Sequence, residues 1–122
     1  MSHAPRPIKE ERVKGRVKKL LSKYNAYFFM PVQSGFGAAA LDFQGCHQGR
    51  FFAVETKAPG KHLTARQELI RDMIERAGGT VFVVGEQALY WTGEDKNGLG
   101  VRKKLKTFTG MEALEGWLLL GR

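Results

Sequence analysis

The fold is decided by residues 49–67, GRFFAVETKAPGKHLTARQ, which predict a strand, a turn and the start of a helix. Arg50 to Lys57 is rich in aromatic and branched residues and is typical of a strand. Thr64 is followed three positions later by Gln67, a spacing that predicts an N-cap and a capping box. The helix that begins there is expected to end at Gly78-Gly79. This stretch therefore predicts a strand-helix unit.

The neighbouring segments complete a sheet around this unit. Leu41 to Cys46 precedes the strand and is separated from it by His47, Gln48 and Gly49, which predicts an antiparallel hairpin. Thr80 to Val84, TVFVV, follows the helix as a short apolar strand. A strand-helix-strand connection places its two strands parallel, so the sheet is predicted to be mixed.

The amino-terminal part predicts one helix and one strand. From Ile8 to Tyr24 the apolar residues recur on one helical face, which is typical of an amphipathic helix. Tyr27 to Val32, YFFMPV, predicts a strand that Pro31 ends or places at a sheet edge. Ser34 to Ala40, SGFGAAA, lacks the spacing of a phosphate-binding loop and is interpreted as a flexible turn that admits DNA.

The carboxy-terminal part is less regular. Ala88 to Thr92 fits either a strand or a turn of helix, and Gly93 to Gly100 predicts a loop. Thr109 is expected to cap a last helix that runs through Trp117. With 122 residues, the chain has the length of one compact domain, and the element order predicts the α/β class.

The charge of the chain favours a polyanionic partner. The formal net charge is +8, from 20 basic and 12 acidic residues. Counterion release from such a partner would drive binding, so nucleic acid is the first candidate. Basic residues concentrate in the first helix and near the carboxyl end, and the predicted nucleic-acid contacts are Lys14, Lys18, Ser34, Lys61, Lys103 and Lys104. The basic helix face has a plainer alternative as a solvated surface.

Several other classes of protein are disfavoured. No apolar run approaches the roughly 20 residues that span a bilayer, so no membrane insertion is expected. No secretory signal is visible, and a cytoplasmic location is expected. Cys46 has no partner for an internal disulfide, and the three histidines lack zinc-ligand spacing.

The hairpin brings two carboxylates together. If Gln48 and Gly49 form a two-residue turn, counting back along both strands places Asp42 opposite Glu55. Such a pair of like charges is destabilising unless a cation lies between them. Lys57 shares a strand face with Glu55 because side chains alternate. The residues therefore indicate a divalent-cation site with an ammonium group beside it.

The first helix offers a third carboxylate. At about 100° per residue, Glu10 lies within roughly 40° of the apolar stripe, whereas Glu11 lies almost opposite to it. A carboxylate on the inward face is costly unless it is paired or bound to a metal. Glu10 is therefore favoured over Glu11 as the ligand from this helix.

These residues carry a resemblance to a known superfamily. The order Glu10, Asp42, Glu55-Thr56-Lys57 and Gln67 resembles the PD-(D/E)xK nucleases, and residues 49–67 look like the stand-alone VRR-NUC endonucleases of bacteriophages. The resemblance implies a restriction-endonuclease-like core, alpha-beta-beta-beta-alpha-beta, with a central mixed sheet flanked by helices. It also implies one VRR-NUC-like nuclease domain over residues 1–122. Leu41 stands where family members carry a proline.

The resemblance also implies a chemistry. Asp42 and Glu55, with the Thr56 carbonyl and Glu10, would hold Mg²⁺ or Mn²⁺. Lys57 would orient the attacking water or offset charge on the transition state. Gln67 would support either Lys57 or that water. The implied protein is a homodimeric DNA endonuclease that cuts phosphodiester bonds, with a possible preference for branched DNA or junctions.

Plainer alternatives stand beside this interpretation. Glu55 and Lys57 alone would fit a solvated ion pair, and Gln67 would fit a purely structural capping box with Thr64. A non-catalytic nucleic-acid-binding protein on the same fold is the alternative function. A structural protein with a basic face would explain the charge but not the carboxylates.

Overall fold

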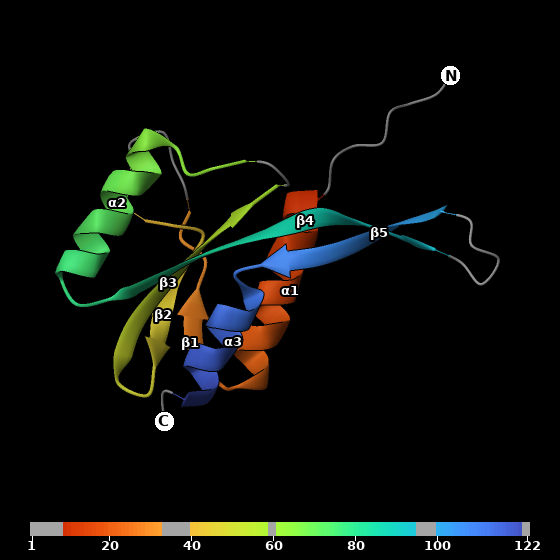
Figure 1. The fold of residues 1–122 in the computed structure, drawn as a ribbon. Helices are drawn as coiled ribbons and strands as arrows, with labels where there is room; N and C mark the ends of the chain where they lie inside the picture. Colours follow the sequence, from red (N-terminus) through yellow and green to blue (C-terminus); the bar gives the residue numbers. More distant parts are fainter. Residues whose placement is uncertain (1–8, 33–39, 59–60, 95–99, 121–122) are drawn as a thin grey trace, which may run out of the picture.

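The computed structural model describes residues 9–32, 40–58, 61–94 and 100–120, with the backbone alone at residues 9, 86–94 and 100–109. Its centre is a mixed sheet of five strands in the order β1-β2-β3-β4-β5. Helices α1 and α3 lie on one face of the sheet and α2 lies on the other (Figure 1). This is an α/β arrangement, as expected from the element order.

The first three strands are antiparallel. Strand β1 spans Tyr27–Phe29, β2 spans Phe43–His47 and β3 spans Arg50–Lys57. His47 pairs with Arg50 across the turn. Gln48 and Gly49 form that turn with φ values of 54° and 79°, which match a two-residue hairpin of the type whose twist suits paired strands. The predicted hairpin and its register are confirmed.

Helix α2 and strand β4 follow as a parallel crossover. Helix α2 spans Ala65–Arg76, with Thr64 as its N-cap, and β4 begins at Thr80. Strand β4 pairs with β3 in parallel, from Phe52 opposite Thr80 to Lys57 opposite Gly85. The predicted helix, its cap and the parallel pairing are therefore confirmed.

The end of the chain differs from the prediction. Strand β4 spans Thr80–Glu94 and pairs antiparallel with β5, Gly100–Thr109. The two strands form a ribbon that extends beyond the helices (Figure 1). The expected end of the strand at Val84 was wrong, because pairing with β5 extends β4 to Glu94. Of the loop expected over Gly93 to Gly100, Gly93, Glu94 and Gly100 lie in the strands instead, and residues 95–99 are outside the described part of the chain. The strand alternative for Ala88 to Thr92 is the one observed.

Two further boundaries are corrected. Helix α3 spans Met111–Leu120, and Thr109 does not cap it because this residue pairs with Gly85 in the sheet. Gly110 makes the turn between them with φ of 80°, a conformation that costs glycine little. Strand β1 ends at Phe29, before Pro31, whose missing amide hydrogen cannot extend the ladder.

The main core lies between the sheet and helices α1, Lys9–Lys23, and α3. It contains ten buried residues of the described chain: Val13, Val17, Leu21, Ala26, Phe43, Phe52, Val54, Val84, Leu114 and Leu118. The apolar stripe predicted for the first helix supplies three of them, at spacings of four residues. In the described part of the chain no helix is long and apolar enough to cross a membrane.

Candidate active site

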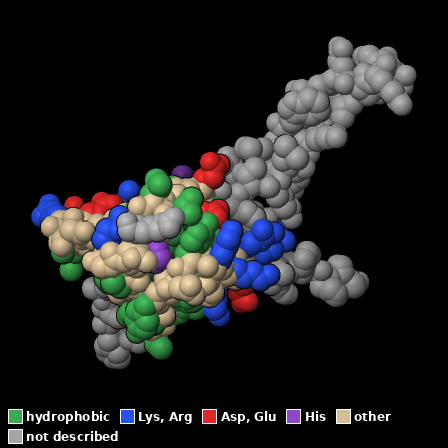
Figure 2. Space-filling model, turned by 90° about the horizontal axis from the view of Figure 1, so that it is seen from below, with side chains coloured by type: hydrophobic (Ala, Val, Ile, Leu, Met, Phe, Trp, Pro, Cys, Tyr) green, Lys and Arg blue, Asp and Glu red, His purple; other side chains and the backbone are tan. Residues whose placement is uncertain are grey.

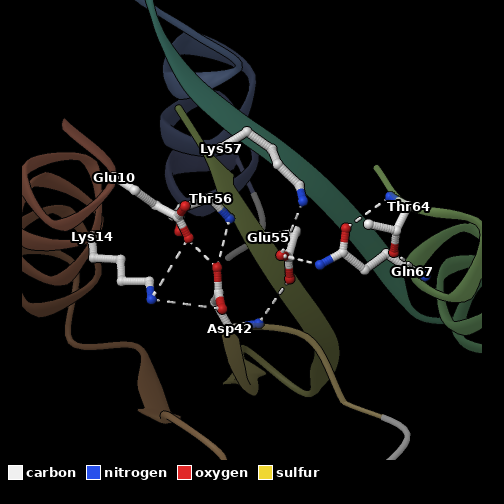
Figure 3. Close-up of polar contacts among 8 residues, drawn as sticks. All are labelled: Glu10, Lys14, Asp42, Glu55, Thr56, Lys57, Thr64 and Gln67. Atoms are coloured by element: carbon white, nitrogen blue, oxygen red, sulfur yellow. Dashed lines mark hydrogen bonds and ion pairs between the residues drawn. The ribbon is translucent and has the colours of Figure 1, made fainter. Parts of the chain in front are cut away.

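A pocket of about 280 Å³ lies where the start of α1, the end of β3 and the start of α2 meet (Figure 3). All five residues predicted to be catalytic line it. The lining consists of Glu10, Ala40, Asp42, Glu55, Lys57, Thr64, Arg66, Gln67 and Ile70. Elements far apart in the sequence therefore bring the predicted residues to one place.

Asp42 and Glu55 meet as the hairpin register predicts. The pairing of Phe43 with Val54 ends the ladder one position before them. The Asp42 backbone N–H donates to Glu55 Oε1 at 3.1 Å. Asp42 Oδ2 in turn accepts hydrogen bonds from the Thr56 backbone N at 2.9 Å and from Thr56 Oγ1 at 2.6 Å. These bonds fix the Asp42 carboxylate at the end of β3.

Glu55 is a buried carboxylate, with only 3% of its surface exposed. Burial raises its pKa to about 7, and the nearby charge of Asp42 adds to the rise. The Asp42 backbone N–H and Lys57, whose Nζ lies 3.8 Å from Glu55 Oε2, oppose this shift in the Glu55 pKa. Near neutral pH the ionised form of Glu55 thus lacks full compensation by its protein neighbours.

Gln67 makes the predicted capping box and, in addition, a hydrogen bond to Glu55. Its Oε1 accepts from the Thr64 backbone N at 2.9 Å, and its backbone N donates to Thr64 Oγ1 at 3.1 Å, which completes the capping box. Its Nε2 donates to Glu55 Oε2 at 2.7 Å. Because the cap engages the amide oxygen, the amide nitrogen is directed at Glu55. The helix cap therefore orients a contact to the acidic pair.

The first helix contributes a carboxylate and an ammonium group. Glu10 lines the pocket, whereas Glu11 is exposed on α1, as the helical geometry predicted. Lys14 Nζ lies 3.8 Å from Glu10 Oε2 and 3.9 Å from Asp42 Oδ1. Lys14 was predicted as a DNA contact, and its place beside Asp42 was missed. The Glu10–Lys14 spacing of four residues was the signal that could have revealed it.

Of the other predicted nucleic-acid contacts, the structure describes the side chains of two, Lys18 and Lys61. Both are exposed and do not line the pocket. Lys103 and Lys104 belong to β5, where the side chains are outside the described residues, and Ser34 is outside them altogether.

Arg66, in the first turn of α2, lines the pocket and was not singled out from the sequence. Figure 2 shows basic side chains gathered beside hydrophobic ones on the face seen from below.

The three carboxylates of the predicted metal site line one pocket, and the ligand set stays a prediction. Over residues 9–32, 40–58, 61–94 and 100–120, no three Asp, Glu, His or Cys side chains converge as metal ligands. Lys14 lies near both Glu10 and Asp42, so its ammonium group offsets part of the negative charge that would otherwise attract a metal ion. The Asp42–Glu55 pair still fits a Mg²⁺-type ion, which is often held by one or two carboxylates with water and phosphate oxygens.

No family model and no curated protein matches this chain. The resemblance to a nuclease superfamily therefore rests on the motif residues of the sequence and stays a prediction.

Proposed function

We propose that this chain is a divalent-metal-dependent DNA endonuclease of the PD-(D/E)xK type, similar to stand-alone VRR-NUC proteins. One observation carries the proposal: Asp42, Glu55, Lys57 and Gln67 line one pocket, and the buried Glu55 has a pKa raised to about 7. A pair of carboxylates with a poorly compensated charge favours a hard cation, and perturbed pKa values gather at functional sites.

In this proposal each side chain has one task. Asp42 and Glu55, with the Thr56 carbonyl and Glu10, hold Mg²⁺ or Mn²⁺, which when bound polarises the scissile phosphate and acidifies water. Lys57 offsets negative charge that builds on the phosphoryl oxygens as the bond to the leaving sugar oxygen breaks. Gln67 keeps the Glu55 carboxylate in position through its 2.7 Å hydrogen bond.

The proposed substrate is DNA. The net charge of +8 supports a polyanionic ligand, and exposed Lys18 and Lys61 are available for phosphate contacts outside the pocket. A homodimer with two active sites, and a preference for branched DNA or junctions, belong to the same proposal through the resemblance. Their support is the motif order and not a contact in the structure.

A second candidate, a non-catalytic nucleic-acid-binding protein, is favoured by one observation. The described residues contain no three-ligand metal cluster, and Lys14 approaches Asp42 as a built-in cation. In that case the pocket would be a charge-balanced structural site, and the basic surface alone would bind nucleic acid. Metal binding and cleavage separate the two candidates.

The test is incubation of the purified chain with supercoiled plasmid, linear duplex and a four-way junction, in Mg²⁺, Mn²⁺ or EDTA. We expect cleavage with either metal and none in EDTA. Asp42→Ala or Glu55→Ala should lower the rate by about 1,000-fold with DNA binding retained, because each removes a proposed metal ligand. Glu11→Ala, on the exposed face of α1, removes a carboxylate outside the pocket; it is the control and should cut like the wild type.

Two results would decide against the proposal. Cleavage that persists in EDTA would refute metal dependence, and full cleavage by both Asp42→Ala and Glu55→Ala would refute the site. Lys57→Ala should lose cutting while calorimetry still detects Mn²⁺ binding. Lost Mn²⁺ affinity in that variant would contradict the role given to Lys57.

A further inference from the structure

The edge strand β1 holds two aromatic rings in solvent. Tyr27 is 68% exposed and Phe29 is 46% exposed, and their ring centroids lie 6.4 Å apart. Phe28, between them, packs against the main core, with its ring 5.9 Å from that of Phe43. Because side chains alternate along a strand, β1 turns one ring inward and two outward. We call Tyr27 and Phe29 the outward aromatic pair.

The sheet register places this pair on the same face as the acidic pair. Phe29 is opposite Gln44 and Tyr27 is opposite Cys46, and both partners follow Asp42 at every second position of the same chain segment. Successive rows on one face are about 7 Å apart. Phe29 therefore lies about one row, and Tyr27 about two rows, from the row of Asp42. The outward aromatic pair and the acidic pair therefore lie on the same face of the sheet, within about two rows of each other.

The chemistry of this face changes along its length. Beside the outward aromatic pair, in the same rows on β2, this face presents Gln44 and Cys46, which carry no formal charge. At the pocket it presents the ammonium groups of Lys14 and Lys57 together with the carboxylates of the proposed metal site. Flat apolar rings, followed by a pocket where the proposed metal ion and two ammonium groups would meet a phosphate, match a ligand with flat bases and an anionic backbone, which is a nucleic-acid strand.

Charge distinguishes this ligand from a second copy of the chain. Another copy would bring its own net charge of +8 to the same surface, and like-charged molecules repel one another. A nucleic-acid strand brings the opposite charge. In a duplex the bases stack on each other and their flat faces are covered, so the rings require bases that are unpaired.

We propose that the outward aromatic pair stacks unpaired nucleobases of the DNA strand whose phosphate enters the pocket. This rests on the proposed function for the identity of the ligand and adds the class of substrate, DNA with a single-stranded segment next to the scissile phosphate. Tyr27 and Phe29 are binding residues in this proposal and take no part in the chemistry.

The test compares the binding of labelled single-stranded oligothymidine and of a duplex of equal length by the full-length chain in EDTA, where metal-dependent cleavage does not occur. The double variant Tyr27→Leu, Phe29→Leu keeps apolar strand residues but removes both rings. We expect its affinity for the single strand to fall about 100-fold, about tenfold per ring, and its affinity for duplex to fall less than about threefold. Leu69→Ala, which trims an exposed apolar side chain of α2, is the control and should bind both DNAs like the wild type.

Three outcomes would overturn the proposal. The first is a wild type that does not bind the single strand, and the second is a double variant that loses no affinity or loses it equally for both DNAs. The third is a wild type that sediments as a dimer while the double variant sediments as a monomer, because the rings would then join two copies.

A direct readout is photocrosslinking of bromodeoxyuridine-substituted single strand, which should label the segment that contains Tyr27 and Phe29. If the wild type never cuts DNA with metal and the double variant still loses single-strand binding, this inference is upheld and the proposed enzyme activity is refuted.

Discussion

The two faces of the sheet are built differently. The face under α1 and α3 buries ten residues in a continuous apolar core, whereas the face under α2 buries four, Leu41, Ala53, Ile70 and Val81, among the described residues. The second face also carries the pocket with Asp42 and Glu55, and a groove of about 570 Å³ between α2 and β3. We infer that the first face supplies most of the stability and that the second leaves room for a ligand.

Strand β3 shows how one segment serves both faces. Phe52 and Val54 point into the main core, while Ala53 and Glu55 point toward α2. The alternation of side chains along the strand therefore separates packing from chemistry at neighbouring positions.

The largest effect is expected for Phe52→Ala on the first face. It removes a fully buried aromatic side chain that also lies against Trp117, with ring centroids 5.5 Å apart. We expect a loss of about 4 kcal/mol in the free energy of unfolding, measured by urea denaturation. Met73→Ala on α2, where the residue is 58% exposed, should cost less than about 0.5 kcal/mol. Similar losses in the two variants would break the contrast between the faces.

Glu55→Gln tests the charge on the second face through pH. Because the native pKa is raised from 4.5 to about 7, the native state binds more protons than the unfolded state in this window. The metal-free wild type should therefore lose stability as pH rises from 4.5 to 7, by about 3 kcal/mol from this group at about 1.4 kcal/mol per pKa unit. The variant lacks this loss.

The measurement is urea unfolding of both proteins in EDTA at several pH values. The stability of Glu55→Gln relative to the wild type should increase with pH up to about 7 and then level off. Parallel stability curves for the two proteins would show that Glu55 ionises without a penalty, and the second face would then lack the charge that we assign to it.

Lys14→Met tests whether the ammonium group competes with a metal. Lys14 Nζ lies 3.9 Å from Asp42 Oδ1, so a bound dication has to act against its positive charge. We expect Mn²⁺ to bind about tenfold more tightly to this variant in calorimetry. Lys18→Met, at an exposed position one turn along α1, should leave the affinity unchanged. Weaker Mn²⁺ binding by Lys14→Met would instead make Lys14 part of the metal-holding structure.

The smallest effect is expected for Thr64→Ala, which removes the N-cap of α2. Thr64 Oγ1 accepts from the Gln67 backbone N, and Ile70 is the buried residue of α2, so this helix depends on its cap. We expect a loss of about 1 kcal/mol in thermal unfolding, and about none for Thr64→Ser, which keeps the hydroxyl. A loss in both variants would place the role of Thr64 in its methyl group and not in its cap.

Local patterns were sufficient for the hairpin, α1, α2 and the parallel pairing of β4. The two-residue turn at Gln48 and Gly49 fixes the register, so the meeting of Asp42 and Glu55 followed from counting. The length of β4 and the presence of β5 were not predictable in this way. Their residues gain strand structure from pairing with each other, and that pairing has no signal within either segment.

At the pocket the sequence by itself determined which side chains share a face: Glu10 inward on α1, and Glu55 with Lys57 on β3. These relations follow from the helix and strand periods, which are properties of the local backbone. Only the tertiary structure decided that Lys14 would approach Asp42 and that Gln67 would reach Glu55. Those contacts depend on how α1 and α2 pack on opposite faces of the sheet, and packing geometry is set by the whole core.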